Sequence, residues 1–315
     1  MREDIRIYDF DFNLIYIISD WISVNWELYY NKAGTFELHL PLYSGIIKAL
    51  TENMYLVAVQ GEKQAIITGK MFSDDIAVYG RTPNWILSKR IITPFETVST
   101  TNYEVLIRSK LSEIFDSSDN FVLATPLADF ESFEEYELNS AKDALTFTCE
   151  CLEKEQAGNK VTFLPIEHKW EFEIYRGEEK SIILSEANKN AYTPKYTEDI
   201  LELSNGLYFK DKESDTYSSF NSDKKGIYRW YTLGTSDNAV DAKQELNKKK
   251  INRTLTFETA QILHGRDYRL GDIMYVETDF GEYKIRKQQR VAGVRIWNEP
   301  LNSGESPVFE NKESD

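Results

Sequence analysis

Three histidines and two cysteines are the side chains of this sequence best suited to bind metals or move protons near neutral pH. His39, His168 and His264 lie far apart in the sequence and match no zinc-binding spacing. Cys149 and Cys151 are two residues apart on a segment with helical periodicity, where such neighbours point about 200° apart and converge poorly on one ion. These five residues therefore predict no metal centre.

Two further motifs resemble catalytic signatures. Asp279-Phe280-Gly281 spells the magnesium motif of protein kinases, but no glycine-rich loop or strand lysine motif precedes it, so we interpret Gly281 as a hairpin turn residue. The acidic segment 129–137 could supply paired carboxylates for sugar cleavage, with Glu134 and Glu135 as candidates. Adjacent acids do not show the facing geometry which that reaction needs, so we interpret the segment as a solvated acidic loop.

No other motif in the sequence indicates catalysis. A phosphate-binding loop, a G-x-S-x-G elbow and a dinucleotide fingerprint are all absent. We therefore predict no catalytic residue, no cofactor-binding residue, no metal ligand and no cofactor. The 17 Phe, 6 Trp and 19 Tyr could line a sugar-binding groove, but strands and interfaces favour the same residues. Lys284, Arg286 and Arg290, with Arg295 nearby, could form a basic face toward an acidic partner or solvent.

Length and charge narrow the class of protein. A chain of 315 residues exceeds the roughly 250 to 300 residues that one core serves, so two or three modules are expected. Lys and Arg number 37 against 52 Asp and Glu, and the net charge of −15 disfavours general binding to nucleic acid. The N-terminus does not resemble a signal peptide, and no apolar run approaches the roughly 20 residues that span a bilayer.

Most of the sequence around these candidate residues is predicted to form strands. Apolar and polar residues alternate over 22–30 and again over 35–40, which predicts a hairpin with its turn at Asn31-Lys32-Ala33-Gly34. Further strands are predicted at 55–59, 65–68, 76–79, 169–175, 181–184, 227–231, 255–259, 273–278, 283–287 and 291–297. This pattern predicts a mainly β fold built from antiparallel sheets or barrels.

Three helices interrupt the strands. One begins at the capping box Thr101-Asn102-Tyr103-Glu104, a second begins near 140–143, and a third begins near Ser236 and Asp237. In the second helix, the spacing of Ala144, Leu145, Thr148, Cys149 and Leu152 predicts that Cys149 faces inward and Cys151 does not. The polar stretch 210–226 has no periodicity and is predicted to be a long exposed loop.

These elements predict a domain organisation. Residues 1–98 form a first β-barrel module, completed by strands from about 160–205, and 99–159 form an inserted, helix-containing α+β module. Residues 206–300 form a second strand-rich barrel module that includes a helix at 237–250. The tail 301–315 is polar and is expected to fray.

Several segments resemble the tail-hub proteins of siphophages and prophages of Gram-positive bacteria, which form the N-terminal part of tail-associated lysins. The segment Gly34-Thr35-Phe36-Glu37-Leu38-His39-Leu40-Pro41 is similar to the family's G-T-F-E-L-x-L-P element, and RTPNWILSKRIITP at 81–94 is similar to its L-x-x-R-I-I-x-P element. DYRLGDIMYVE at 267–277 and RVAGVRIW at 290–297 resemble its late strands. The resemblance covers nearly the whole chain.

The resemblance implies a baseplate-hub fold with two tube-type β-barrel modules and small peripheral modules. It implies a homotrimer at the distal end of a tail tube, which joins the sixfold tube and the distal tail protein ring to a threefold tip or fibre protein. Tape-measure protein, and later DNA in transit, would pass through its channel. The chain would be made in the bacterial cytoplasm and reside in a virion tail or tail-like particle. Because the sequence ends soon after the last hub-like strand, we expect an adaptor and not an enzyme.

Two alternatives stay open at this point. One is a cell-wall-degrading, tail-associated hydrolase that uses carboxylates such as Glu134 and Glu135. The other is a receptor-binding or glycan-binding tail module that recognises surface sugars through its aromatic residues.

Overall fold

The computed structural model describes residues 3–42, 44–211, 216–235, 239–259, 262–300 and 302–310. The chain forms two compact units, which we describe separately. Unit 1 comprises Met1–Pro194 and Phe257–Asp315, and unit 2 comprises Lys195–Thr256. The prediction of one module over 206–300 is therefore wrong, because 195–256 separates from the later strands and has its own small core.

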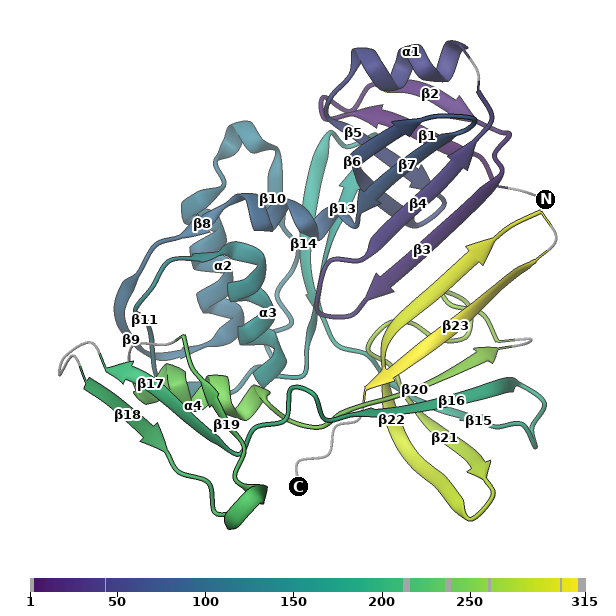
Figure 1. The fold of residues 1–315 in the computed structure, drawn as a ribbon. Helices are drawn as coiled ribbons and strands as arrows, with labels where there is room; N and C mark the ends of the chain where they lie inside the picture. Colours follow the sequence, from purple (N-terminus) through teal and green to yellow (C-terminus); the bar gives the residue numbers. More distant parts are fainter. Residues whose placement is uncertain are drawn as a thin grey trace. The chain divides into compact units, whose positions relative to one another are not determined.

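Seven antiparallel strands of unit 1 form the first part of its main sheet (Figure 1). In sheet order they are β3 (Ser23–Tyr29), β4 (Thr35–Leu40), β7 (Ile76–Arg81), β6 (Lys63–Phe72), β5 (Leu56–Gln60), β1 (Ile5–Asp9) and β2 (Leu14–Ile18). Helix α1 (Ser44–Glu52) adds Ile46 and Leu50 to the core beneath them. Because Trp26 and Phe36 are buried there, the predicted alternation and its hairpin are confirmed.

The strand β22 (Tyr283–Asn298) continues this sheet into the C-terminal part of unit 1. Its residues 293–298 pair with β3, and its residues 283–290 pair with β21 (Ile273–Phe280). Strand β15 (Glu179–Leu184) pairs in parallel with β21. The sequence predicts two strands where the structure has this single one, whose register shifts between Val291 and Gly293.

The C-terminal segment is also part of the sheet. Strand β23 (Ser303–Glu310) pairs with β22 and buries Glu305, Pro307 and Phe309, so the predicted frayed tail is wrong for 303–310. Residues 311–315 lie outside the described part of the chain. The sequence hides this strand because a carboxylate occupies a buried position. Glu305 accepts hydrogen bonds from the Tyr268 hydroxyl (2.9 Å) and the His264 backbone N–H (2.6 Å).

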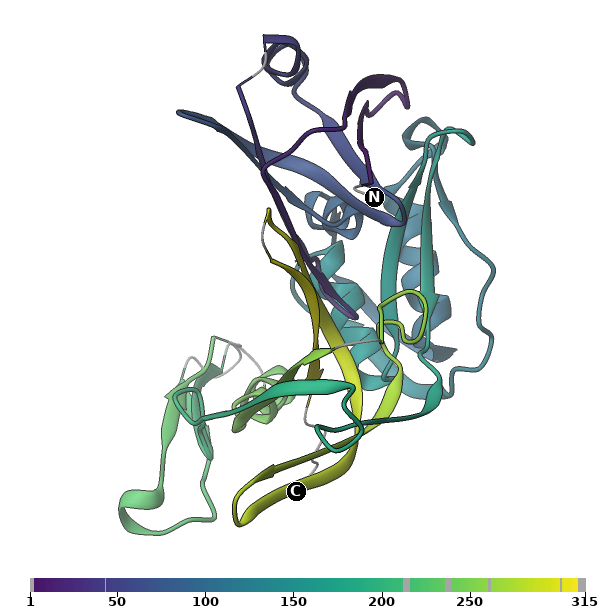
Figure 2. The ribbon, with the colours of Figure 1, turned by 90° about the vertical axis from the view of Figure 1, so that its right-hand side faces the viewer.

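A helix-containing segment lies within unit 1. It contains η1 (Pro83–Lys89), β8 (Ile91–Ile92), β9 (Phe95–Asn102), α2 (Tyr103–Ile114), η2 (Ser117–Asp119), β10 (Phe121–Leu123), β11 (Ser132–Leu138), β12 (Lys142–Asp143) and α3 (Ala144–Lys154), followed by β13 (Gly158–Leu164) and β14 (Lys169–Tyr175). Helices α2 and α3 lie beside β13 and β14 (Figure 2). Their core also contains Phe12 and Val57 from the N-terminal part of unit 1.

Strands from 160–205 do not complete the first sheet as predicted. Strands β13 and β14 pair with each other and with β10, and β15 pairs with β21. The prediction is wrong because the apolar faces of β13 and β14 pack on the inserted helices, where Phe163 and Phe172 are fully buried.

Helix α3 buries a different face from the predicted one. Phe147 and Cys151 are fully buried, together with Ala144, Thr148 and Leu152, whereas Cys149 is only partly buried. The observed face includes the large Phe147 ring at the i+3 position from Ala144, and its apolar area outweighs that of Leu145.

Unit 2 is small and mixed. Strands β17 (Gly206–Asp211), β18 (Thr216–Phe220) and β19 (Tyr231–Leu233) form a sheet in the order β18-β17-β19, and helix α4 (Ala239–Lys248) covers Leu207 and Phe209. Strands β16 (Ala191–Asp199) and β20 (Asn252–Thr259) run across its two chain boundaries. The predicted loop over 210–226 contains β18 and the end of β17 instead, while 212–215 lie outside the described residues. The predicted strand at 227–231 begins within the short helix η3 (Gly226–Tyr228), and only Tyr231 belongs to a strand, β19. The predicted helix start at Ser236 and Asp237 lies outside the described residues.

Candidate assembly surface

The outward face of the main sheet in unit 1 is the candidate site. A groove of about 610 Å³ crosses it, and strands β22, β3, β4, β7 and β6 each contribute side chains. The lining residues with polar or aromatic groups are Asn25, Trp26, Glu27, Thr35, Phe36, Glu37, Thr68, Tyr79, Arg81, Arg295 and Trp297. The groove lies along the pairing of β3 with β22, so it spans the junction between the N-terminal and C-terminal parts of the sheet.

Glu27 is the centre of a hydrogen-bonded cluster in this groove. Its carboxylate accepts hydrogen bonds from the Tyr29 hydroxyl (3.2 Å) and the Thr35 hydroxyl (3.3 Å), and it forms an ion pair with Arg295 (3.0 Å). Burial, followed by the Glu27 charge, raises the pKa of the Tyr29 phenol. Because the Arg295 side chain is 59% exposed, its ion pair orients the groups more than it stabilises the fold.

A second polar cluster continues along β4. The ring of His39 lies between two carboxylates, with Nδ1 2.7 Å from Asp75 and Nε2 2.9 Å from Glu37. The hydrogen bond to Asp75, followed by the one to Glu37, raises the pKa of His39. Nearby on β22, the indole N–H of Trp297 is shielded from solvent and has no hydrogen-bond partner in the described structure.

The polar side chains of this groove are held in place by one another. No group of three or more His, Cys, Asp or Glu side chains within the described ranges could hold a metal ion. The groove is open, and its acids are already paired with bases or hydroxyls. A sheet face of this kind offers fixed polar groups and aromatic rings to another protein surface.

The other residues that the sequence analysis weighed are dispersed. Burial lowers the pKa of His264 to about 4, and His168 lies in a turn with a φ of 52°. Burial also raises the thiol pKa of both Cys149 and Cys151 to about 12, so neither is suited to be a nucleophile. Gly281 has a φ of 78° in the turn between β21 and β22, which confirms the hairpin interpretation of the kinase-like motif.

Most of the acidic segment is a strand and not the expected loop. Residues 132–138 form β11, which pairs with β9, and Glu135 is exposed on it opposite Ser99. The side chain of Glu134 lies outside the described part of the structure. The strand forms because Phe133 and Tyr136 pack against Tyr103 of α2.

The four basic residues of the late hairpin do not form one free basic face. Lys284 pairs with Asp279 at 3.2 Å, and Arg295 pairs with Glu27. Arg290 donates to the carbonyl of Gly271 (2.8 Å) and to the side chain of Gln156 (3.1 Å). Arg286 is exposed and lies opposite Glu277 of β21. Of the four residues, it alone has no ion pair or hydrogen bond to a described residue.

Residues of the two tail-hub-like segments 34–41 and 81–94 hold parts of unit 1 together. A Cβ on Gly34 would lie 2.0 Å from the carbonyl oxygen of Glu27, so only glycine fits, and the Gly34 N–H donates to the Thr82 hydroxyl at 2.6 Å. Asn84 then donates to the side chain of Asn159 (3.0 Å), whose backbone N–H donates to the carbonyl of Tyr30. These buried contacts join β4, η1 and β13.

The Leu270-Gly271-Asp272 segment also joins segments of unit 1, at the start of β21. The Asp272 carboxylate is buried and accepts from the backbone N–H groups of Glu178 and Arg269, both at 2.8 Å. A Cβ on Gly177 would lie 1.9 Å from the backbone of Gly271, so the two chains pack without side chains between them. The motif therefore fixes β15 and β21 in unit 1.

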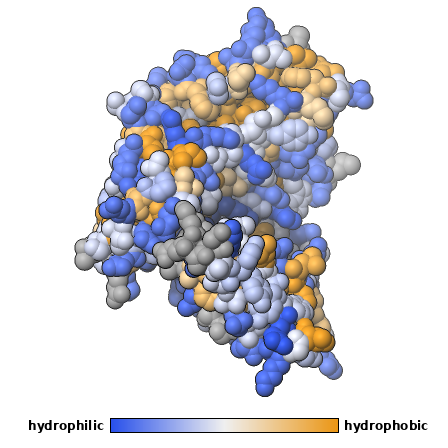
Figure 3. All heavy atoms as spheres, turned by 60° about the vertical axis from the view of Figure 1, so that its left-hand side comes forward, coloured by the Kyte–Doolittle hydropathy of each residue, from blue (hydrophilic) through white to orange (hydrophobic). Residues whose placement is uncertain are grey.

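The sequence pattern does not predict the exposed aromatic residues of unit 2. Tyr217, Tyr228 and Trp230 are 64%, 68% and 39% exposed, and Ile227 is 86% exposed. Figure 3 shows that apolar residues also gather in separate patches among hydrophilic ones on one face of the molecule. The basic run Lys224-Lys225-Gly226 before Ile227 is the signal that argues against a buried strand there.

Comparisons with known proteins identify this fold. Residues 4–114 match the family described as Siphovirus ReqiPepy6 Gp37-like protein. The structure is similar to a tail protein of Neisseria meningitidis MC58 (TM-score 0.58, 12% identity, 99% of this chain and 97% of that chain covered). It is also similar to the 43 kDa tail protein of prophage MuSo2 from Shewanella oneidensis (TM-score 0.59, 10% identity, 98% of each chain covered). A third similar structure is prophage tail protein gp18 of Listeria monocytogenes EGD-e (TM-score 0.55, 14% identity, 99% of this chain and 95% of that chain covered).

These matches confirm the resemblance to phage tail proteins and the mainly β fold class with its α+β insertion. A comparison with curated proteins finds no match. No helix within the described ranges is long and apolar enough to cross a membrane.

Proposed function

We propose that this chain, which has the fold of phage tail proteins, is the structural hub at the distal end of a tail tube in a virion or tail-like particle. Three copies would form a ring that joins the sixfold tube and the distal tail protein to a threefold tip or fibre protein. Tape-measure protein and then DNA would pass through the ring.

The single observation that supports this proposal most is the extent of the structural likeness. It covers 98% to 99% of this chain and 95% to 98% of three tail proteins, so the likeness extends over both units of the fold. A protein with two sheet-rich parts per copy could present six similar surfaces from three copies, which suits the meeting of a sixfold tube with a threefold tip.

The polar groove of unit 1 supports an assembly role. It crosses the β3–β22 pairing, where both parts of the sheet contribute residues such as Glu27 and Arg295. A surface shared by both parts of the sheet is suited to contact either a neighbouring subunit or the next ring of the tail.

An electron cryomicroscopy reconstruction of the particle that carries this chain tests the proposal. We expect three copies at the distal end of the tube, between the distal tail protein and the tip. A different location, or six copies in the ring, would show that the hub role is wrong.

We also propose that the chain acts without catalysis. Purified protein should release no soluble fragments from cell walls, and the Glu135→Gln variant should behave identically. Release of fragments by the wild type but not by the variant would support the hydrolase alternative instead.

A further inference from the structure

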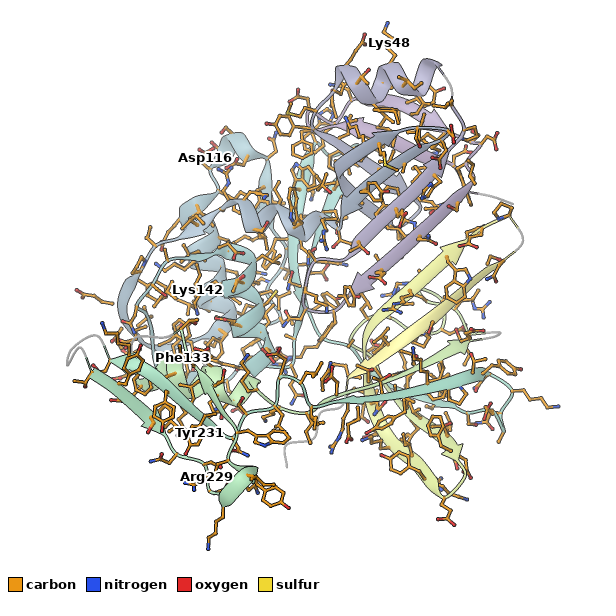
Figure 4. All side chains as sticks on the ribbon, viewed as in Figure 1. Lys48, Asp116, Phe133, Lys142, Arg229 and Tyr231 are labelled. Carbon is orange, nitrogen blue, oxygen red and sulfur yellow. The ribbon has the colours of Figure 1, made fainter. Side chains whose placement is uncertain are left out.

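An exposed turn of unit 2 combines apolar and basic side chains. Residues 224–230, which we name the basic knuckle, connect β18 to β19 and contain η3. Ile227 and Tyr228 are 86% and 68% exposed, and Lys224, Lys225 and Arg229 are exposed beside them. Figure 4 labels Arg229 in this turn and Tyr231 at the start of β19. Tyr, Trp and Arg are the residues that most often dominate the binding energy of protein interfaces.

The basic knuckle has a defined conformation. The side chain of Asn205 donates to the carbonyl of Tyr228 (2.8 Å) and accepts from the N–H of Trp230 (2.9 Å). The indole N–H of Trp230 donates to the carbonyl of Ile227 at 3.0 Å. Gly226, with a φ of 59°, permits the turn that leads into η3. Because these bonds already fix the backbone, a partner would not have to order it on binding.

The charge of unit 2 differs from that of unit 1. Residues 195–256 contain 11 Lys and Arg against 10 Asp and Glu, a net charge of +1. Because the whole chain has a net charge of −15, the residues of unit 1 have a net charge of −16. Lys225 and Arg229 form no ion pair with any residue that the structure describes. The basic knuckle is therefore suited to an acidic surface, and such a surface occurs on unit 1 of this same protein.

The acidic surface is the two-stranded pair β9 and β11, which we name the acidic ribbon. Glu96, Glu131, Glu135 and Glu137 are exposed on or beside it, and the segment 129–137 contains no basic residue. A groove of about 530 Å³ runs along it between residues 94–97 and 137–139. The ribbon is firmly held because Phe95 and Tyr136 both pack on Phe147 of α3.

We propose that the basic knuckle of one copy docks into the acidic ribbon groove of a neighbouring copy. Ile227 and Tyr228 would enter the groove, and Lys225 and Arg229 would meet the carboxylates of Glu135 and Glu137. This inference rests on the proposed hub function, since it assigns one contact between the copies in the ring. The opposite charges would align the two surfaces and raise the association rate.

Charge reversal on both sides tests the contact. The knuckle variant carries Lys225→Glu with Arg229→Glu, and the ribbon variant carries Glu135→Lys with Glu137→Lys. The measurement is the mass of the full chain by sedimentation equilibrium from low to high micromolar concentration, at low and at physiological salt. We expect the wild type to self-associate, each variant to raise the dissociation constant about tenfold or more, and the fourfold variant with both changes to regain association.

Two controls separate this contact from other effects. Lys48→Glu with Lys284→Glu makes the same charge change as the knuckle variant on exposed side chains of unit 1, and it should leave association unchanged. Figure 4 shows Lys48 on α1. Ile227→Ala removes apolar area from a side chain that is 86% exposed, so it should weaken association without affecting folding. Circular dichroism confirms the folding of each variant.

Three results would overturn the inference. They are a wild type that stays monomeric throughout, a knuckle variant that associates as well as the wild type, and a fourfold variant that is folded but does not recover. None of them contradicts the hub role, because the location and copy number in the particle test that role separately.

Discussion

The ring of Tyr30 occupies the space that a side chain at position 271 would need. A Cβ on Gly271 would lie 2.3 Å from Cε2 of Tyr30, and a Cβ on Gly158 would lie 2.4 Å from the same ring. The Tyr30 hydroxyl donates to the carbonyls of Gln156 (2.9 Å) and Tyr175 (3.2 Å). One buried side chain after β3 therefore sets the spacing between the start of β13, the end of β14 and the segment that precedes β21.

Replacing Gly271 with alanine should strongly destabilise the protein. The new Cβ would clash with Tyr30, and the φ of 88° is unfavourable for alanine, so we expect a loss of about 3 kcal/mol or more in the free energy of unfolding. Gly281→Ala is the matched control, because its φ is 78° and no atom lies within 4 Å of the added Cβ. The control should lose about 1 kcal/mol in urea unfolding, and equal losses would contradict the role of Tyr30.

The substitution Asp272→Asn should destabilise the connection between β15 and β21. An amide has one acceptor oxygen where the buried carboxylate serves two backbone N–H groups, so we expect a loss of about 2 kcal/mol. Asp279→Asn, on an exposed residue paired with Lys284, should cost less than about 0.5 kcal/mol. Chemical denaturation measures both, and a small effect at position 272 would count against this anchoring role.

The last described strand should contribute to global stability. Phe309→Ala removes a fully buried ring that contacts Phe257, so we expect a loss of about 3 to 5 kcal/mol. Phe280→Ala, at the tip of the β21–β22 hairpin, changes a ring that is 39% exposed and should cost under about 1 kcal/mol. Similar melting temperatures for wild type and Phe309→Ala would mean that β23 does not belong to the folded sheet.

The His39 cluster should make stability depend on pH. Hydrogen bonds to Asp75 and Glu37 raise the pKa of His39 above 6.5. Its contribution is therefore complete below about pH 6.5 and is lost as the pH rises through the raised pKa. At the acidic end, the hydrogen bond from His39 lowers the pKa of Asp75, so that carboxylate contributes until the pH falls through its lowered pKa.

The measurement is the difference in melting temperature between the wild type and His39→Gln across this range. This difference should be largest in mildly acidic buffer and shrink toward alkaline pH. The Asp75→Asn variant lacks the carboxylate that raises the pKa of His39 most, so its stability should also depend less on pH than that of the wild type. A difference that stays constant with pH would contradict the assignment.

Much of the fold could be predicted from the sequence, because most buried positions are apolar. Trp26, Phe36 and Leu38 alternate with polar neighbours, so β3 and β4 follow directly from the pattern. The pattern fails for β23, where Glu305 and Pro307 occupy buried positions. Hydrogen bonds from Tyr268 and the His264 backbone N–H to Glu305, together with the strand pairing, explain this burial. It also fails for α3, where the choice between Leu145 and Phe147 depends on the packing of neighbouring elements.

The candidate surfaces were less predictable, because they depend on which strands are neighbours. Glu27 and Arg295 are 268 positions apart in the sequence, and only the β3–β22 pairing brings them together. The sequence predicts a strand over 227–231, which overlaps residues 227–230 of the basic knuckle. The structure instead uses Asn205 to close the turn, which exposes Ile227 and Tyr228.

The continuity of β22 limits how unit 1 can deform. Its residues 293–298 are hydrogen-bonded to β3 and its residues 283–290 to β21, so one stretch of backbone belongs to both parts of the sheet. A pull along this strand would load many hydrogen bonds in parallel, and they would have to break together. The register shift between Val291 and Gly293 is where such a strand can bend without losing its partners. Under load, unit 1 should therefore behave as a single stiff element that flexes at that bulge.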